Sequence, residues 1–243
     1  MSLKVTLALT GGAVFGAALA CAQFAGAELP GESGLDRIQA TNTVRTRLAR
    51  GQGVEVKVGF HGGIWASTDG TTWTPQQSGI VFSFYAVAHG KGMFVAVGNE
   101  GALVTSDDGF TWTIRDSGTD ERLRGVAYAN GTFVAVGYEG TILTSKNGTH
   151  WRSRNSKTGD RLQAVAHGCG TFVTVGWNGM IRTSPEGSRW TARTSGVSGR
   201  LYALTYNNGL FVASGDAGET LVSGDGLTWA VRRPVRQGIT SND

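Results

Sequence analysis

Five tryptophans recur at a constant interval of 39 residues, with no insertion or deletion between them: Trp73, Trp112, Trp151, Trp190 and Trp229. A Ser lies six residues before each Trp, and a Gly lies three, eleven and fourteen residues before it. The three Gly positions, each repeated five times, account for 15 of the 38 Gly among the 243 residues. Because five copies agree so closely, the chain must fold as a series of equivalent structural units.

Each unit has the pattern of four short β-strands. In the third copy we expect these strands at residues 123–128, 133–137, 141–145 and 151–154. Asn130-Gly131 supplies the positive φ angles of a tight hairpin turn between the first two. Periods near 40 residues with this strand content are typical of propeller blades. The sequence therefore predicts an all-β fold, a β-propeller of about five four-stranded blades over residues 45–239.

A short motif precedes each tryptophan. The pattern Ser-x-Asp-Gly-x-Thr-Trp is complete at residues 67–73, nearly so at 106–112 and 223–229, and reduced at 145–148 and 184–187. This motif resembles the Asp-box, or BNR-type, turn of sialidase-like and photosystem assembly-factor propellers. The resemblance covers residues 45–233 and implies that the box is a structural turn without a catalytic role. It also implies a membrane complex as a plausible class of partner.

The N-terminus has the pattern of an export signal. Lys4 precedes an uncharged stretch at residues 5–27, which contains small residues suited to cleavage before Gln23 or before Glu28. Lipidation of Cys21 and retention of an uncleaved membrane-anchor helix are alternatives. All three place the folded part outside the cytoplasm, on the periplasmic or extracytoplasmic side. We expect a signal or anchor at 1–27, a linker at 28–44, the propeller at 45–239 and a tail at 240–243.

Charge and residue content argue against several functional classes. The formal net charge is +4, and the basic residues are dispersed without a run, so a nucleic-acid partner is not expected. No phosphate-binding Gly-Lys-Ser loop or nucleophile elbow is present, and we expect no cofactor. His89 and His167 occupy equivalent repeat positions and are expected to be packing residues, so no metal site is predicted.

Variable positions gather at one face of the predicted ring. Because strands alternate in direction, the loop between the second and third strands lies on the same face as the entry to the first strand. These loops and entries vary between blades, and variation on a fixed frame marks a binding surface. The candidate partner-binding residues are Glu100, Arg122, Tyr138, Glu139, Arg161, Trp177, Asn178 and Arg200.

Two interpretations of these residues remain open. Tyr138 and Trp177 could form an aromatic platform beside the arginines, which would suit an acidic partner. Alternatively, the arginines pair with acidic residues in a solvated network between blades, with Glu100, Asp120, Glu139 and Asp160 as the acids.

The sequence favours a non-catalytic, exported or membrane-anchored propeller that acts as a protein-interaction scaffold or assembly subunit of a membrane-associated complex. A lectin-like carbohydrate-binding propeller using Tyr138 and Trp177 is the alternative. A sialidase-type hydrolase, with Tyr138 and Glu139 as candidate catalytic groups, is less favoured because the Arg-Ile-Pro motif of that family is absent.

Overall fold

The computed structural model of the protein describes residues 47–232. The expected signal or anchor at 1–27, with Cys21 as a candidate lipid site, lies outside these residues, as do the linker at 28–44 and the tail at 240–243. No helix within residues 47–232 is long and apolar enough to cross a membrane.

Residues 47–232 form five antiparallel four-stranded sheets, each with its strands in chain order. Blade 1 comprises β1 (Leu48–Gly51), β2 (Val54–Val58), β3 (Ile64–Ser67) and β4 (Thr74–Gln76). Blade 2 comprises β5 (Phe84–Gly90), β6 (Met93–Gly98), β7 (Leu103–Ser106) and β8 (Thr113–Ile114). Blade 3 comprises β9 (Leu123–Ala129), β10 (Thr132–Gly137), β11 (Ile142–Ser145) and β12 (Arg152–Arg154).

Blade 4 comprises β13 (Leu162–Gly168), β14 (Thr171–Gly176), β15 (Ile181–Ser184) and β16 (Thr191–Arg193). A single 3₁₀ turn, η1 (Trp177–Gly179), lies between its second and third strands. Blade 5 comprises β17 (Leu201–Asn207), β18 (Leu210–Gly215), β19 (Thr220–Ser223) and β20 (Ala230–Arg232). The predicted all-β propeller with about five four-stranded blades is confirmed.

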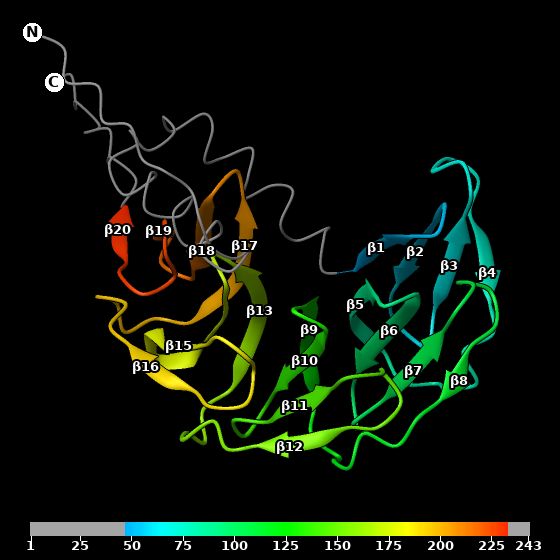
Figure 1. The fold of residues 1–243 in the computed structure, drawn as a ribbon, viewed down its shortest axis with the longest axis horizontal. Coiled ribbons are helices and arrows are strands. Elements are labelled where there is room, and N and C mark those ends of the chain that lie inside the picture. The colour runs from blue at the N-terminus through cyan, green and yellow to red at the C-terminus, as the bar shows by residue number, and fades with distance from the viewer. Residues whose placement is uncertain (1–46, 233–243) are drawn as a thin grey trace, which may run out of the picture.

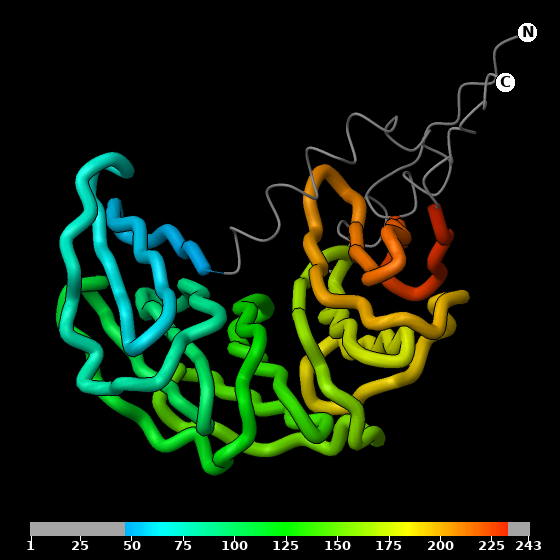
Figure 2. The backbone as a smooth tube through the Cα atoms, turned by 180° about the vertical axis from the view of Figure 1, so that it is seen from behind, coloured from blue at the N-terminus to red at the C-terminus, as the bar shows by residue number. Residues whose placement is uncertain are grey.

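The five blades are arranged around an arc, with the first strand of each blade innermost (Figures 1 and 2). Each inner strand packs against the inner strand of the next blade, in the order β1, β5, β9, β13 and β17. Blades 1 and 5 lie at the two ends of this arc in both views. The small residues on the inner strands, such as Gly125, allow this close approach: a Cβ there would contact the backbone of Ala164 and Val165 in the next blade.

The second strand of each blade extends the contact between neighbouring sheets beyond the inner strands. Its alternate residues point to opposite faces of the sheet. Val95 and Val97 of β6 share a buried cluster with Phe133 and Ala135 of β10, one blade further along. Both faces of the strand are therefore buried, which explains the continuous apolar run that recurs in each repeat.

The two ends of the arc differ in chemistry. At the outer face of blade 1, Glu55 and Lys57 stand at the repeat positions of Phe94 and Ala96 in blade 2. Glu55 forms an ion pair of 2.8 Å with Arg50, and the Lys57 ammonium lies 3.4 Å from the centre of the Trp73 ring. Blade 1 thus presents a polar face where the next blades present apolar ones, as the terminal unit of a repeat array does.

The opposite end of the arc is apolar. Val212 and Val222 of blade 5 are buried in a small cluster, which Leu210 joins among the residues described. The counterparts of Val212 in blades 2 to 4 share buried clusters with residues of the following blade: Val95, Val134 and Val173.

The Asp-box motif forms a hydrogen-bonded turn. In blade 2 the Ser106 Oγ accepts from the Gly109 amide at 2.7 Å and donates to the Asp108 Oδ1 at 2.9 Å. The same carboxylate oxygen accepts from the Phe110 and Thr111 amides at 2.7 and 2.8 Å. The Trp112 indole donates to the Gly109 carbonyl at 3.2 Å, which fixes the ring beside the inter-blade core.

The other two recurrent Gly positions contact the entries to inner strands, one in the next blade and one in its own blade. The Gly101 amide donates at 3.0 Å to the carbonyl of Glu121, at the entry to the next blade, and its φ of 64° is the left-handed conformation that favours Gly. Gly98 ends β6 directly against the carbonyl of Ser83, where any Cβ would clash. The high Gly content therefore reflects recurrent backbone contacts in a regular frame.

Candidate functional site

One face of the arc brings the variable loops beside the entries to the inner strands, as the strand directions predict. The amide of Tyr138 donates to the Arg122 carbonyl at 2.9 Å, and that of Trp177 donates to the Arg161 carbonyl at 3.0 Å. The amide of Asp216 makes the equivalent bond to the Arg200 carbonyl at 3.0 Å. We call this face the mouth, and define it by the 2–3 loops and first-strand entries of the blades.

Two predicted arginines lie between aromatic rings at the mouth. The Arg161 guanidinium carbon lies 4.6 Å from the ring centre of Tyr138 and 4.5 Å from that of Trp177. The Arg122 guanidinium carbon lies 5.2 Å from the ring centre of Tyr138 and 5.7 Å from that of Tyr85. Cation–π contacts at these distances are attractive. Tyr85, Arg122, Tyr138, Arg161 and Trp177 thus form an alternating row across three blades, which we call the arginine–aromatic row.

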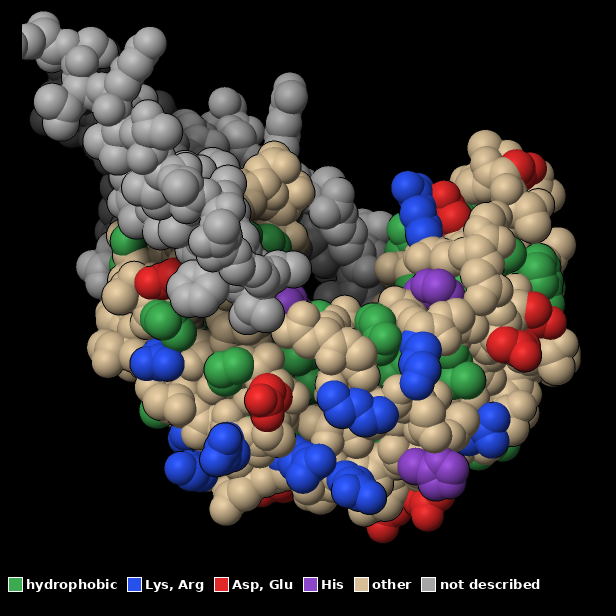
Figure 3. All heavy atoms as spheres, viewed as in Figure 1, with side chains coloured by type: hydrophobic (Ala, Val, Ile, Leu, Met, Phe, Trp, Pro, Cys, Tyr) green, Lys and Arg blue, Asp and Glu red, His purple; other side chains and the backbone are tan. Residues whose placement is uncertain are grey.

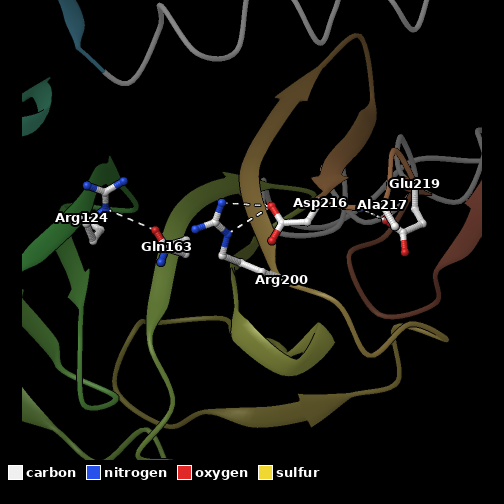
Figure 4. Close-up of polar contacts among 6 residues, drawn as sticks. All are labelled: Arg124, Gln163, Arg200, Asp216, Ala217 and Glu219. Carbon is white, nitrogen blue, oxygen red and sulfur yellow. Dashed lines mark hydrogen bonds and ion pairs between the residues drawn. The ribbon is translucent and has the colours of Figure 1, made fainter.

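A bulge in each of four inner strands adds side chains that the sequence did not assign to the site. The register of strand pairing skips one residue in blades 2, 3, 4 and 5, at Tyr85, Arg124, Gln163 and Tyr202. Bulges re-aim side chains and are frequent beside functional sites. The Arg124 Nε donates to the Gln163 Oε1 at 3.2 Å (Figure 4), and its guanidinium lies 4.3 Å from the centre of the Tyr85 ring. The residue type at this bulge position differs between repeats, and that difference was the sequence signal that could have assigned these side chains to the site.

The remaining predicted residues have other contacts. Arg200 forms an ion pair of 3.0 Å with Asp216, and both side chains are nearly half exposed (Figure 4). The Asn178 Nδ2 donates to the Asp160 Oδ1 at 2.8 Å. The remaining two predicted acids, Glu100 and Glu139, occupy turn positions with φ near 50°.

The alternative ion-pair network is not formed among residues 47–232. Glu100 accepts a long hydrogen bond of 3.4 Å from Asn99, whose Oδ1 accepts from the Arg122 Nε at 2.7 Å. No ion pair within the described range joins Arg122 or Arg161 to an acidic side chain. Within residues 47–232, therefore, no carboxylate compensates the charge of these two arginines.

The pKa values at the mouth reflect this concentration of positive charge. Burial lowers the pKa of Arg124, and the nearby charges of Arg122 and Arg47 lower it further. Burial by itself would raise the pKa of Tyr138, but the hydrogen bond from Arg122 and the charges of Arg124 and Arg122 bring it below its usual value. The lowered pKa of Tyr138 thus results from the positive charge at the mouth, whereas that of Arg124 results mainly from burial.

Metal ligation finds no support in the described part of the chain. Residues 47–232 contain no group of three or more His, Cys, Asp or Glu side chains that could hold a metal ion. The rings of His89 and His167 pack against Phe94 and Phe172, with ring centres 4.5 and 4.7 Å apart. Burial lowers the pKa of both histidines, as suits packing residues.

The five sheets and their Asp-box turns define the class of protein, a repeat β-propeller. Solved structures with this fold include YCF48 bound to D1 peptide, with a TM-score of 0.61 and 16% identity over 79% of this chain and 68% of that one. The YCF48 of Cyanidioschyzon merolae gives a TM-score of 0.56 and 15% identity over 76% and 70% of the two chains.

A glycoside hydrolase has the same fold. The GH74 enzyme of Niastella koreensis gives a TM-score of 0.51 and 19% identity over 75% of this chain but only 30% of its own. No family model matches the sequence, and no curated protein does. The predicted resemblance to sialidase-like and assembly-factor-like repeat propellers is confirmed at the level of the fold.

Proposed function

We propose that this chain is a non-catalytic propeller that binds a protein partner at its mouth. The observation that carries the proposal is the arginine–aromatic row, in which Arg122 and Arg161 lie between aromatic rings without an acidic partner among residues 47–232. Neighbours of the same fold support a protein ligand, because one is bound to a D1 peptide and another belongs to a nidogen/laminin complex.

The chemistry of the row suits an acidic peptide. A guanidinium that stacks on a ring through its face keeps N–H groups at its edge, which can form paired hydrogen bonds with a carboxylate. Tyr, Trp and Arg are also the residues that dominate binding energy at protein interfaces. The partner segment therefore carries Asp or Glu side chains, or a free C-terminal carboxylate.

Binding without catalysis is favoured by the contacts of two aspartates at the mouth. Asp216 accepts from Arg200, and Asp160 accepts from Asn178 and Thr158. These carboxylates are engaged in holding the frame, which favours a structural role over proton transfer.

We also propose a location for the protein outside the cytoplasm. The uncharged stretch at residues 5–27 supports export and attachment to a membrane, so we propose a scaffold or assembly subunit of a membrane-associated complex on the periplasmic or extracytoplasmic side. External protease added to intact cells with a permeabilised outer layer is expected to digest the propeller, and protection until the cytoplasm is opened would contradict export.

Co-isolation from detergent-solubilised membranes tests the partner. We compare the tagged full-length protein with the double variant Arg122→Ala/Arg161→Ala and with Arg115→Gln/Arg193→Gln. The second variant removes the same charge from the rim, and Gln is the residue of blade 1 at that repeat position (Gln76). The wild-type protein and the rim variant are expected to recover the same membrane subunits, at least tenfold more than the mouth variant recovers. Equal recovery by all three would contradict the proposal.

A further inference from the structure

A groove of about 760 Å³ lies at the rim between blade 3 and the box turn of blade 4. Lys146, His150, Arg152 and Arg154 line it from blade 3, and Glu186 and Ser188 line it from blade 4. Its volume is in the range of sites for small ligands. Because box turns connect third to fourth strands, this groove opens on the face opposite the mouth. Lys and Arg side chains are visible along this edge of the molecule, over β11 and β12 (Figure 3).

Two basic residues of the groove, Lys146 and Arg152, are specific to blade 3, whereas Arg154 stands at a position where blades 2, 4 and 5 also have Arg. Arg152 stands where three other blades have Thr and blade 5 has Ala: Thr74, Thr113, Thr191 and Ala230. Lys146 stands where the other blades have four different residues without positive charge: Thr68, Asp107, Pro185 and Gly224. The regular frame of the repeat does not require either positive charge.

The basic residues Lys146 and Arg152 do not accompany a loss of the box turn in blade 3. In blade 3 the Ser145 Oγ accepts from the Gly148 amide at 2.8 Å, and the Asn147 Oδ1 accepts from the Thr149 and His150 amides at 3.1 and 3.0 Å. Asn147 thus keeps the hydrogen bonds that Asp makes in blades 1, 2 and 5, and it lacks their negative charge. The turn is preserved while a charge that would repel an anion is absent.

The charged groups of the groove are held but not neutralised. The Lys146 Nζ donates to the Thr132 Oγ1 at 2.6 Å, and the Arg154 Nε donates to the Thr144 Oγ1 at 2.8 Å. Both acceptors are uncharged hydroxyls. Within the described residues, Arg152 and Glu186 form no ion pair, so three cationic side chains and one carboxylate remain available to a ligand.

We propose that this groove binds an acidic oligosaccharide, whose sugar rings carry carboxylate or sulfate groups. The forked donors of Arg152 and Arg154 match the oxygens of either anion. Glu186 can accept, and Ser188 can donate or accept, hydrogen bonds with the sugar hydroxyls. A groove of about 760 Å³ lined by polar side chains of two blades accommodates a short polar chain.

Calorimetric titration of the full-length protein at 150 mM salt tests the proposal. The probes are tetragalacturonate for carboxylate, a chondroitin sulfate tetrasaccharide for sulfate, and cellotetraose as the neutral control of equal length. At least one acidic probe is expected to bind, with cellotetraose at least tenfold weaker. Lys146→Thr/Arg152→Thr, which installs the residues of blade 1, is expected to weaken that binding at least tenfold.

Two matched variants distinguish binding in the groove from attraction to positive charge elsewhere on the protein. Arg115→Gln/Arg193→Gln removes two charges from the rims of blades 2 and 4 and is expected to change the affinity less than threefold. Arg122→Ala/Arg161→Ala, at the mouth, is expected to do the same, so this test is independent of the proposed partner site. Absence of binding by both acidic probes, or equal weakening by all three double variants, would overturn the proposal, since the latter indicates attraction to a basic surface in general.

Discussion

The side-chain oxygen of Asn147 in blade 3 accepts hydrogen bonds from the amides two and three residues further on, as the carboxylate of Asp108 does in blade 2. The two side chains therefore make the same hydrogen bonds, and Asn147 lacks the negative charge of Asp108. Comparison of Asp108 with Asn147 therefore separates the effect of the hydrogen bonds from the effect of the carboxylate charge.

This pair predicts a pH dependence of stability. The hydrogen bond from the Thr111 amide, above all, holds the pKa of Asp108 below its usual value, although burial opposes the shift. A carboxyl group with a lowered native pKa stabilises the fold above its unfolded pKa of about 3.9, and this contribution is lost as the pH falls below that value. Because Asp108 is largely exposed, we expect no more than about 0.5–1 kcal/mol.

Urea unfolding of Asp108→Asn at pH 7 and pH 2.5 measures the effect. The variant is expected to be less stable than the wild-type protein at pH 7, and this difference should be smaller at pH 2.5, because the contribution of Asp108 is lost as the pH falls through its lowered native pKa. Asn147→Asp is the reciprocal control and should gain stability at pH 7 alone. A difference for Asp108→Asn that is the same at both pH values would contradict the assignment to ionisation.

The serines of the box turns predict a second contrast. The Ser106 Oγ makes two hydrogen bonds in its turn, whereas the buried Ser184 Oγ has no hydrogen-bond partner among the described residues. Loss of a satisfied buried hydroxyl costs about 1–2 kcal/mol, and loss of an unsatisfied one costs little. We expect Ser106→Ala to lower the melting temperature by about 2–6 °C and Ser184→Ala to leave it almost unchanged, in thermal melts followed by circular dichroism. Equal losses would show that Ser184 is bonded in solution.

Two glycines with different surroundings give a third prediction. A Cβ at Gly98 would clash with the Ser83 carbonyl, whereas nothing lies within 4 Å of one at Gly131, whose φ is 67°. Gly131→Ala is expected to cost about 1–2 kcal/mol through backbone conformation alone. Gly98→Ala should cost more, because the entry to β5 must move. Equilibrium unfolding of both variants ranks them, and a smaller loss for Gly98→Ala would contradict the close packing of β6 against that entry.

The repeat made the frame predictable, because Trp spacing fixes the number of units and strand alternation fixes which loops share a face. It could not reveal the bulges that place Tyr85 and Arg124 at the mouth, since a one-residue slip in pairing leaves no mark in the repeat length. The pairing of Arg200 with Asp216, and the stacking of Arg161 on rings, depends on side-chain geometry. Sequence spacing does not contain that information.

Two arginines at the mouth, Arg161 and Arg200, differ in their contacts and are therefore expected to differ in their effect on binding. Arg161 stacks between Tyr138 and Trp177, whereas the charge of Arg200 is shared with Asp216. If the row binds an acidic peptide, Arg161→Lys should weaken binding about tenfold, because an ammonium keeps the charge but loses the planar stacking and the paired donors. Arg200→Lys should change the affinity less than threefold.

Both variants are measured by fluorescence anisotropy at 50 and 150 mM salt. The labelled probe is a peptide that contains Asp and Glu and has a free C-terminal carboxylate. Equal affinities for the two variants would show that net charge alone, and not the arginine–aromatic row, attracts the peptide.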